Sequence, residues 1–252
     1  MKKYLPNAIT LLNLFCGCAA LVCVLYGYFI NAFWFLFIGG WADYLDGMVA
    51  RWLKVNSTLG KELDSIADMV SFGVVPGAIL YMLLSAGLRY SEQLAQGGAV
   101  QLLQPTLSPD LSYAALPAFL LSVFAGLRLA RFNLDTRQTE DFIGLATPST
   151  TLFVVGLMLI FHFNSYGLRP VVVSPYFLFP VIVIFSYLMV SELRMFSFKF
   201  KGFRWEGNEI RFIFAAIAIL LLLFLREAAF ATIVLVYIIM AIGQGIFQKI
   251  KI

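Results

Sequence analysis

The chain has 252 residues, of which 61% are hydrophobic and only 13% are charged, and its formal net charge is +4. Because an average soluble domain has about 25% charged residues, this composition excludes an ordinary soluble domain and indicates a protein with several membrane spans. The small positive charge is not evidence for nucleic-acid binding, since in a membrane protein it reports which loops face the cytoplasm.

Eight apolar segments are each long enough, or nearly so, to cross a bilayer as a helix, which takes about 20 residues. The segment between Arg89 and Ser112 contains Gly97-Gly98 and two prolines, and we expect it to be an irregular outer loop. No linker divides the chain, so we expect one all-α integral membrane domain over residues 1–252. In chain order the predicted spans are Ala8–Tyr28, Ala32–Leu53, Glu62–Leu88, Tyr113–Phe132, Thr147–Tyr166, Val173–Leu193, Arg211–Leu225 and Ala229–Phe247.

The lysines and arginines predict the orientation of these spans. With the N-terminus in the cytoplasm, the alternation of eight spans leaves only Arg89, Arg169 and Arg226 of the 18 basic residues on the outside. This bias follows the positive-inside rule, so we expect both termini in the cytoplasm. Residues 194–211 alternate basic and aromatic side chains, and we expect them to dock on anionic headgroups rather than to bind nucleic acid.

An acidic stretch interrupts this apolar chain, with the sequence DYLDGMVARWLKVNSTLGKELDSIAD. Asp43 and Asp46 fall at positions i and i+3 of the second predicted span and therefore share one helix face. Asp64 and Asp68 lie one turn apart on the third span. The short turn between the two spans makes them antiparallel neighbours, so the two acidic faces can converge at their cytoplasmic ends.

Four carboxylates brought together in a low dielectric repel one another, and hard divalent cations relieve this repulsion because they prefer oxygen ligands. Gly47 and Ala50 leave the same helix face without bulk, so phosphates can approach the backbone. Arg51 supplies a fixed positive charge for a phosphate. The stretch therefore indicates a metal–diphosphate site. The alternative is that the acids are solvated charges at the membrane edge, paired with Lys54 and Lys61.

The spacing of these residues resembles the signature of the CDP-alcohol phosphatidyltransferase family. The matching pattern is Asp-x-x-Asp-Gly-x-x-Ala-Arg from Asp43 to Arg51, then eight residues, Gly60, three residues, Asp64, three residues and Asp68. The N-terminal PNAITLLN also resembles the family. Four further stretches are similar to its phosphatidylserine synthase branch, namely ELDSIADMVSFGVVPG, RLARFN, FIGLATP and LMVSELRMFSFK.

The resemblance implies an enzyme of phospholipid biosynthesis that transfers the phosphatidyl group of CDP-diacylglycerol to the hydroxyl of L-serine, giving phosphatidylserine and CMP. It implies a six-helix catalytic core at about 1–193, an extra helical hairpin at about 205–252, a homodimer, and two divalent cations, Mg²⁺ or Mn²⁺. We expect the enzyme in a bacterial inner membrane, with its active site facing the cytoplasm.

The resemblance also implies roles for individual residues of the acidic stretch. Asp68 would be a metal ligand, the catalytic base, or both. CDP-diacylglycerol would be bound by Gly47, Ala50 and Arg51. The full set of metal ligands would be Asp43, Asp46, Asp64 and Asp68.

Polar residues outside the signature are candidates for the remaining contacts. Arg128 and Arg131, with Asn133 assisting, are candidates for binding the serine carboxylate, the alternative being that both arginines only follow the positive-inside bias. Asn7 and Thr10 are candidates for binding the cytidine or diphosphate of CDP-diacylglycerol. Their alternative roles are a helix cap and polar contacts between helices.

Two other functions fit part of the pattern. A transferase of the same family with glycerol 3-phosphate or inositol phosphate as acceptor would need additional cationic residues near the metals, and one for choline would need an aromatic cage. A divalent cation transporter would use the acids as its ion path. The acids lie at the cytoplasmic edge rather than at midspan, however, and Arg51 beside them opposes the passage of a cation.

Overall fold

The computed structural model describes residues 4–55, 57–95, 111–134, 142–196 and 208–250. Lys2, Lys3 and most of the basic–aromatic stretch 194–211 lie outside these residues. In chain order the elements are α1 (Tyr4–Leu25), α2 (Phe29–Leu53), α3 (Thr58–Asp68), η1 (Met69–Val74), α4 (Val75–Ala95), η2 (Tyr113–Phe119), α5 (Leu120–Leu134), β1 (Phe142–Ile143), α6 (Thr147–Phe163), η3 (Ser165–Gly167), α7 (Arg169–Val173), α8 (Pro175–Val190), β2 (Arg194–Met195), α9 (Glu209–Leu225), η4 (Arg226–Ala228) and α10 (Ala229–Ile250).

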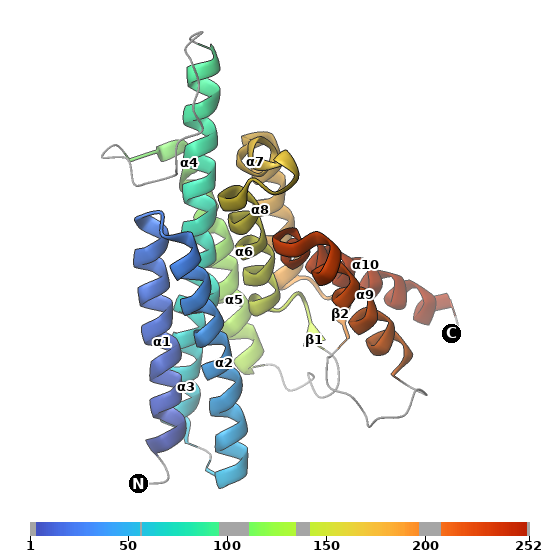
Figure 1. Cartoon of the computed structure of the whole chain (residues 1–252). Helices are drawn as coiled ribbons and strands as arrows, with labels where there is room; N and C mark the ends of the chain where they lie inside the picture. Colours follow the sequence, from blue (N-terminus) through green and yellow to red (C-terminus); the bar gives the residue numbers. More distant parts are fainter. Residues whose placement is uncertain (1–3, 56, 96–110, 135–141, 197–207, 251–252) are drawn as a thin grey trace.

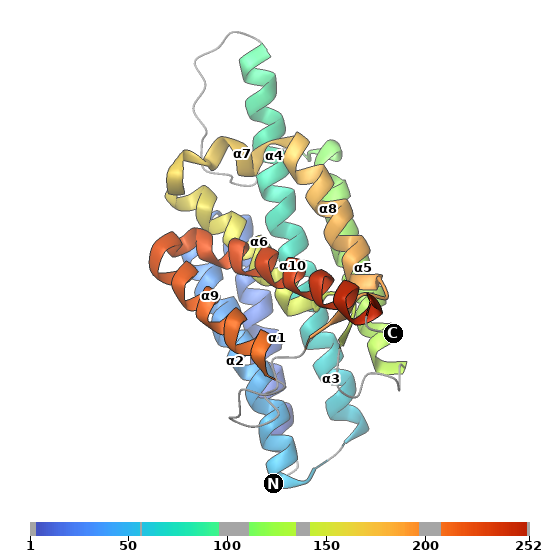
Figure 2. The same cartoon turned by 90° about the vertical axis from the view of Figure 1, so that its right-hand side faces the viewer.

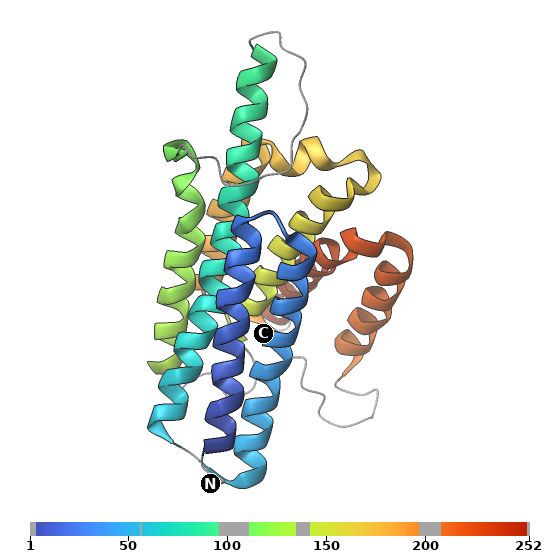
Figure 3. The same ribbon diagram turned by 60° about the vertical axis from the view of Figure 1, so that its left-hand side comes forward.

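The first helices form a bundle that places the acidic stretch. α1 packs against both α2 and α3 and lies between them in Figure 3. The chain reverses between α2 and α3 where Lys54 adopts a left-handed conformation, with φ 52°, and Ser57 caps α3 by accepting a hydrogen bond from the Gly60 N–H at 2.8 Å. The predicted turn is therefore confirmed. It lies at the same end of the bundle as the N-terminus, opposite the far end of α4 (Figure 1).

α4 is the central helix of the protein. Every residue from Val75 to Gly87 is buried, because α1, α5, α6, α7 and α8 all pack around it. A helix that is hydrophobic on all sides is typical of a protein core or of a membrane span. α4 continues to Ala95, so the prediction of an irregular loop from Arg89 onwards is wrong for residues 89–95, which stay helical because the chain has no break before Gly97.

Four helical stretches of the described residues are long and apolar enough to cross a membrane: Tyr4–Leu25, Thr58–Ala95, Tyr113–Leu134 and Glu209–Gly245. The last one bends at Arg226, where φ is 49° and ψ is −120°, so α9 and α10 form a hairpin (Figure 2). α6 and α8 are apolar but shorter. This is the architecture of an all-α membrane protein, as predicted, whereas eight spans stay a prediction.

A short β-pairing links the beginning of α6 to the end of α8. β1 and β2 are antiparallel, with Ile143 opposite Arg194. The Gly144 N–H donates to the Leu193 carbonyl and the Leu145 N–H to the Leu188 carbonyl, both at 2.9 Å. Gly144 has a φ of +75°, which favours glycine. The pairing brings two segments about 50 residues apart in the sequence to the same end of the bundle.

The α9–α10 hairpin is fixed to the bundle by a close approach of α10 to α6. A Cβ atom added to Gly156 on α6 would lie 2.8 Å from the Cβ of Ala231 on α10, closer than two such atoms can pack. In Figure 2, α10 runs across α6. Small residues at such a crossing let two helix backbones approach closely, which is how helices associate in membranes.

We predict that Gly156→Val lowers the stability of the protein, because the added side chain would force α10 away from α6. Overpacking of this kind costs about 1–3 kcal/mol. The measurement is thermal unfolding of the purified protein in detergent. Gly243→Val in α10 is the matched control, since no described atom outside its own stretch of helix lies within 4 Å of the added Cβ. Equal melting temperatures for wild type and Gly156→Val would contradict the close approach.

Candidate active site

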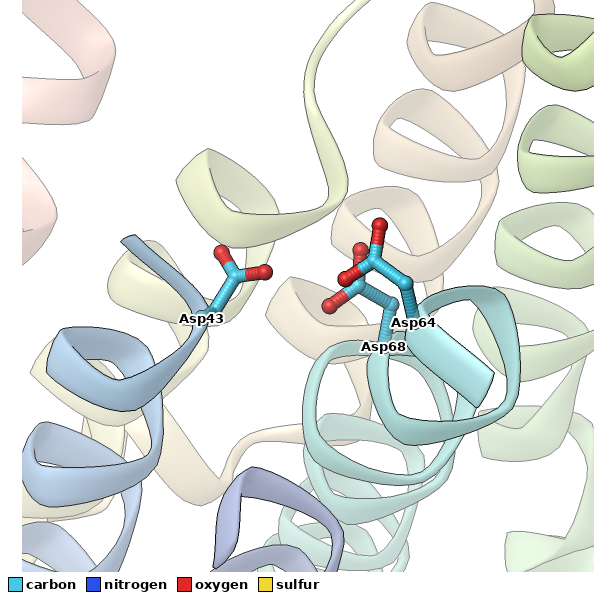
Figure 4. A group of neighbouring side chains, drawn as sticks. All are labelled: Asp43, Asp64 and Asp68. Atoms are coloured by element: carbon cyan, nitrogen blue, oxygen red, sulfur yellow. The ribbon is translucent and has the colours of Figure 1, made fainter. Parts of the chain in front are cut away.

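Three of the four aspartates in the acidic stretch converge. Asp43 on α2 points across the gap between helices toward Asp64 and Asp68, which project from successive turns of α3 (Figure 4). One carboxylate oxygen from each lies within 4.8 Å of the others. All three side chains are half-buried. The two helix faces that the sequence spacing predicts therefore meet in the structure.

The carboxylate oxygens of this cluster are short of hydrogen-bond donors. Asp64 Oδ1 and Asp68 Oδ1 are both buried, and neither accepts a hydrogen bond within the described residues. A buried acceptor without a partner is costly, and three convergent carboxylates add mutual repulsion. A hard divalent cation with oxygen ligands would remove both costs at once. The donor set therefore fits Mg²⁺ or Mn²⁺.

Asp46 lies beside this cluster but is held differently. Its side chain is buried and accepts a hydrogen bond from the Thr10 hydroxyl on α1. It is not part of the group of oxygens within 4.8 Å of one another. Its charge nevertheless lies close enough to interact with Asp64. The structure thus links Thr10, which is predicted to bind CDP-diacylglycerol, to Asp46, which is a predicted metal ligand.

A cavity of about 450 Å³ opens next to Asp46 and Asp64, between α1, α2 and α3, and we call it the polar cavity because seven of its twelve lining residues have polar side chains. It contains four of the five residues predicted to bind CDP-diacylglycerol: Asn7, Thr10, Gly47 and Ala50. Gly60 also lines it, and a side chain there would collide with Asn7, whose Oδ1 would lie 2.9 Å from the added Cβ. Its other lining residues are Pro6, Asp46, Val55, Ser57, Thr58, Lys61 and Asp64.

Arg51 is the fifth residue predicted to bind CDP-diacylglycerol. It is exposed and does not line this cavity. Its guanidinium lies over Gly47, because a Cβ added to Gly47 would be 3.5 Å from Arg51 Nη1. This is an ordinary van der Waals distance, so the arginine itself does not require glycine at position 47.

Arg128, on α5, is a buried cation near the acidic cluster. It is buried, and its Nε has no hydrogen-bond partner within the described residues. It lies near enough to Asp68 for their opposite charges to interact, and its guanidinium carbon is 5.8 Å from the centre of the Phe132 ring. A buried arginine with a free donor is prepared to bind a carboxylate.

Arg131 and Asn133 have other partners. Arg131 is exposed, and its Nη1 lies 3.4 Å from the Val190 carbonyl at the end of α8. Asn133 donates from Nδ2 to the Ser65 hydroxyl at 2.8 Å, which joins α5 to α3 between the two aspartates. The structure therefore places Asn133 beside the acidic helix and Arg131 at the junction with α8.

A second cavity, apolar and about 520 Å³ in volume, lies between α2, α6 and α10. Two of its lining residues lie near the acidic cluster in the sequence, since Tyr44 follows Asp43 on α2 and Phe72 comes four residues after Asp68. Its remaining lining residues are Phe33, Leu36, Phe37, Gly40, Trp41, Pro148, Thr151, Leu152, Val155 and Phe230. Asp46 and Asp64 line the first cavity, and neighbours of Asp43 and Asp68 line the second.

The sequence analysis missed two features of the site. The first is that Val55, Ser57, Thr58 and Lys61 line the polar cavity, for which their place next to Gly60 in the turn was the available signal. The second is the π-helical winding of η1 directly after Asp68. Pro76 signals this break, because proline has no N–H and cannot continue an α-helix undisturbed.

Comparison with known proteins agrees with this geometry. CDP-diacylglycerol–serine O-phosphatidyltransferase of Bacillus subtilis is 32% identical over 197 residues, which is 78% of this chain and 92% of that protein. The enzyme of the same name from Helicobacter pylori (strain 26695) is 28% identical over 253 residues, which is 98% and 93% of the two chains. The one from Methanocaldococcus jannaschii is 28% identical over 190 residues, 75% and 72% of the two chains. The sequence profile described as CDP-alcohol phosphatidyltransferase matches residues 3–189, and the chain therefore belongs to the CDP-alcohol phosphatidyltransferase family.

Proposed function

We propose that this enzyme transfers the phosphatidyl group of CDP-diacylglycerol to the hydroxyl of L-serine, giving phosphatidylserine and CMP. The observation that carries the proposal is the convergence of Asp43, Asp64 and Asp68. Asp64 also lines the polar cavity, and residues near Asp43 and Asp68 in the sequence line the apolar one. The names of the relatives from three organisms support serine as the acceptor. A lipid-linked nucleotide has one polar and one apolar part, which matches the two cavities.

CDP-diacylglycerol, the phosphatidyl donor, fits the site in one orientation. Its cytidine and diphosphate occupy the polar cavity, where Asn7, Thr10, Gly47 and Ala50 line the wall and Arg51 lies over Gly47. Its acyl chains extend toward the apolar cavity. The reacting phosphorus then lies at the carboxylates, between the two parts. Asp43, Asp46, Asp64 and Asp68 would hold two divalent cations, Mg²⁺ or Mn²⁺, which when bound neutralise the diphosphate and stabilise charge on the leaving oxygen.

In the reaction, the serine hydroxyl loses its proton and CMP leaves. The serine hydroxyl attacks the lipid-side phosphorus, a new P–O bond forms, and the bond to the CMP oxygen breaks. Asp68 accepts the hydroxyl proton during this step, because a carboxylate is too weak a base to remove it beforehand. Arg128 pairs with the serine carboxylate, and Asn133 and Arg131 support the acceptor side from the end of α5.

The proposal also covers the membrane orientation, the division of the chain and the oligomeric state. We place eight spans in a bacterial inner membrane, with both termini and the active site facing the cytoplasm. Residues 1–193 form the six-helix catalytic core, residues 205–252 add the hairpin, and two copies form a homodimer. The positive-inside bias of the basic residues supports the orientation, and the end of the family match at residue 189 supports the division.

We predict that the purified protein releases CMP from CDP-diacylglycerol only when serine and Mg²⁺ or Mn²⁺ are present. The measurement is CMP release with serine, glycerol 3-phosphate, inositol phosphate and choline in parallel. Release with another acceptor would keep the family chemistry and overturn the choice of serine. A complete lack of release, together with uptake of divalent metal into liposomes, would favour the transporter function instead.

We predict that Asp68→Asn lowers turnover by about 100-fold or more, the range that removal of a general base covers. Binding of CDP-diacylglycerol should be largely retained, because the polar cavity is lined by residues of α1, α2 and early α3 that do not include Asp68. The measurements are the rate of CMP release and a separate titration of the donor. Equal losses of binding and turnover would make Asp68 primarily a ligand.

We predict that Arg128→Lys raises the KM for serine while the KM for CDP-diacylglycerol stays within about twofold. Replacing the planar guanidinium loses a hydrogen bond between charged groups, and such a bond is worth about 1.5–3 kcal/mol, or about tenfold and more in KM. Arg131→Lys, measured in parallel, should have a smaller effect because Arg131 is exposed and directed at Val190. Unchanged serine use in both variants would exclude the arginines from the acceptor site.

A further inference from the structure

The helix that carries Asp64 and Asp68 changes its winding directly after Asp68. Residues Met69–Val74 form a π-helix, and the Val75 N–H donates to the Val70 carbonyl five residues before it. The helices on either side, α3 and α4, are ordinary α-helices of one continuous stretch. Short π-helical turns inside α-helices often occur at functional sites, and this one adjoins the acidic cluster.

Pro76 explains why the winding changes here. In an α-helix the Phe72 carbonyl would accept a hydrogen bond from the N–H of residue 76, but proline has none and its ring would collide with that carbonyl. The wider π-turn avoids the collision. In a membrane protein the carbonyls that such a turn frees must find donors on neighbouring helices.

Two hydroxyl groups from other helices supply those donors. Thr151 on α6 donates to the Phe72 carbonyl at 3.1 Å, and its Oγ1 is also 3.0 Å from the Thr147 carbonyl of its own helix. Ser122 on α5 donates to the Gly73 carbonyl at 2.8 Å. All of these contacts are buried. A third contact, from the Ser71 hydroxyl to Asn13 Oδ1 at 2.8 Å, ties the same turn to α1.

The winding decides which way the acids face. One residue corresponds to about 100° of rotation in an α-helix, so relaxing the π-turn to an α-turn would rotate α3 relative to α4 by about that angle. The Val75–Gly87 part of α4, which follows the π-turn directly, is buried on all sides and resists rotation. α3 would therefore rotate, and Asp64 and Asp68 would turn away from Asp43.

We propose that Thr151 and Ser122 are positioning residues for the metal site. They hold the π-turn through the Phe72 and Gly73 carbonyls, and the π-turn in turn keeps Asp64 and Asp68 facing Asp43. Neither residue touches a carboxylate. The proposal rests on the metal site of the proposed function, and it requires nothing of the acceptor or of the reaction.

The test measures Mn²⁺ binding to the purified full-length protein by electron paramagnetic resonance, without substrates. Thr151→Val keeps the shape of the side chain, and therefore of the apolar cavity, but removes the donor. We expect it to raise the Mn²⁺ dissociation constant by about three- to tenfold, the range that a hydrogen bond between membrane helices covers. Thr151→Ser restores the hydroxyl and should return binding to within twofold of wild type, which a loss of packing alone would not do.

Thr150→Val is the matched control, because Thr150 is also buried and, among the described residues, its hydroxyl is hydrogen-bonded only to the Ala146 carbonyl of its own helix, at 3.4 Å. It should bind Mn²⁺ as wild type does. Ser122→Ala tests the second contact independently and should also weaken binding. Melting temperatures of all variants identify any that fail to fold.

The possible failures are distinguishable. If the wild type binds no Mn²⁺ and Asp64→Asn changes nothing, the metal site itself is wrong. If the wild type binds Mn²⁺ and both Thr151→Val and Ser122→Ala bind it equally well, the positioning role is overturned while the metal site stands. Equal weakening by Thr150→Val and Thr151→Val would also overturn it, because the effect would then not depend on the contact with Phe72.

Discussion

The mutual repulsion of carboxylates in an apolar environment is the constraint on which this structure depends. A helical membrane protein gains nothing from three half-buried aspartates of which one oxygen each lies within 4.8 Å of the others. Among the described residues, Asp64 Oδ1 and Asp68 Oδ1 also lack a hydrogen-bond donor. Such a cluster persists only if the surrounding helices fix it and a cation balances it. The fold meets the first requirement with a capped turn, a π-turn and hydrogen bonds between helices.

One part of the site is held by contacts between residues close in the sequence, and another part by contacts between residues far apart in the sequence. The α2–α3 turn, with Ser57 as the cap, brings two neighbouring helices together. Asn133, by contrast, reaches Ser65 from a helix about 70 residues further along the chain. The segments 128–133, 142–148 and 188–195 also converge at one end of the bundle through the β-pairing and the Arg131 contact. The residues proposed to bind the acceptor therefore come from segments far from the α2–α3 turn in the sequence.

The sequence predicted the local part of this arrangement well. Helical spacing alone placed Asp43, Asp64 and Asp68 on facing surfaces, because the period of an α-helix is fixed and the turn between the helices is short. It could not predict the burial of Arg128, or that Arg131 would be exposed only three residues later, since that difference depends on how α5 packs against α3 and α8. It also gave no means to place the apolar cavity, to which α2, α6 and α10 all contribute. The irregular loop predicted from Arg89 failed because nothing in residues 89–95 stops a helix already anchored by its buried half.

The hairpin of α9 and α10 lies outside the part of the chain that matches the family, yet Phe230 at the start of α10 lines the apolar cavity and contacts Phe33 of α2, with ring centres 5.7 Å apart. A chain ending at β2 would leave that side of the cavity open to the bilayer. The hairpin therefore closes part of the apolar cavity through Phe230. A substitution in this hairpin can change the shape of a cavity that otherwise belongs to the part of the chain matching the family.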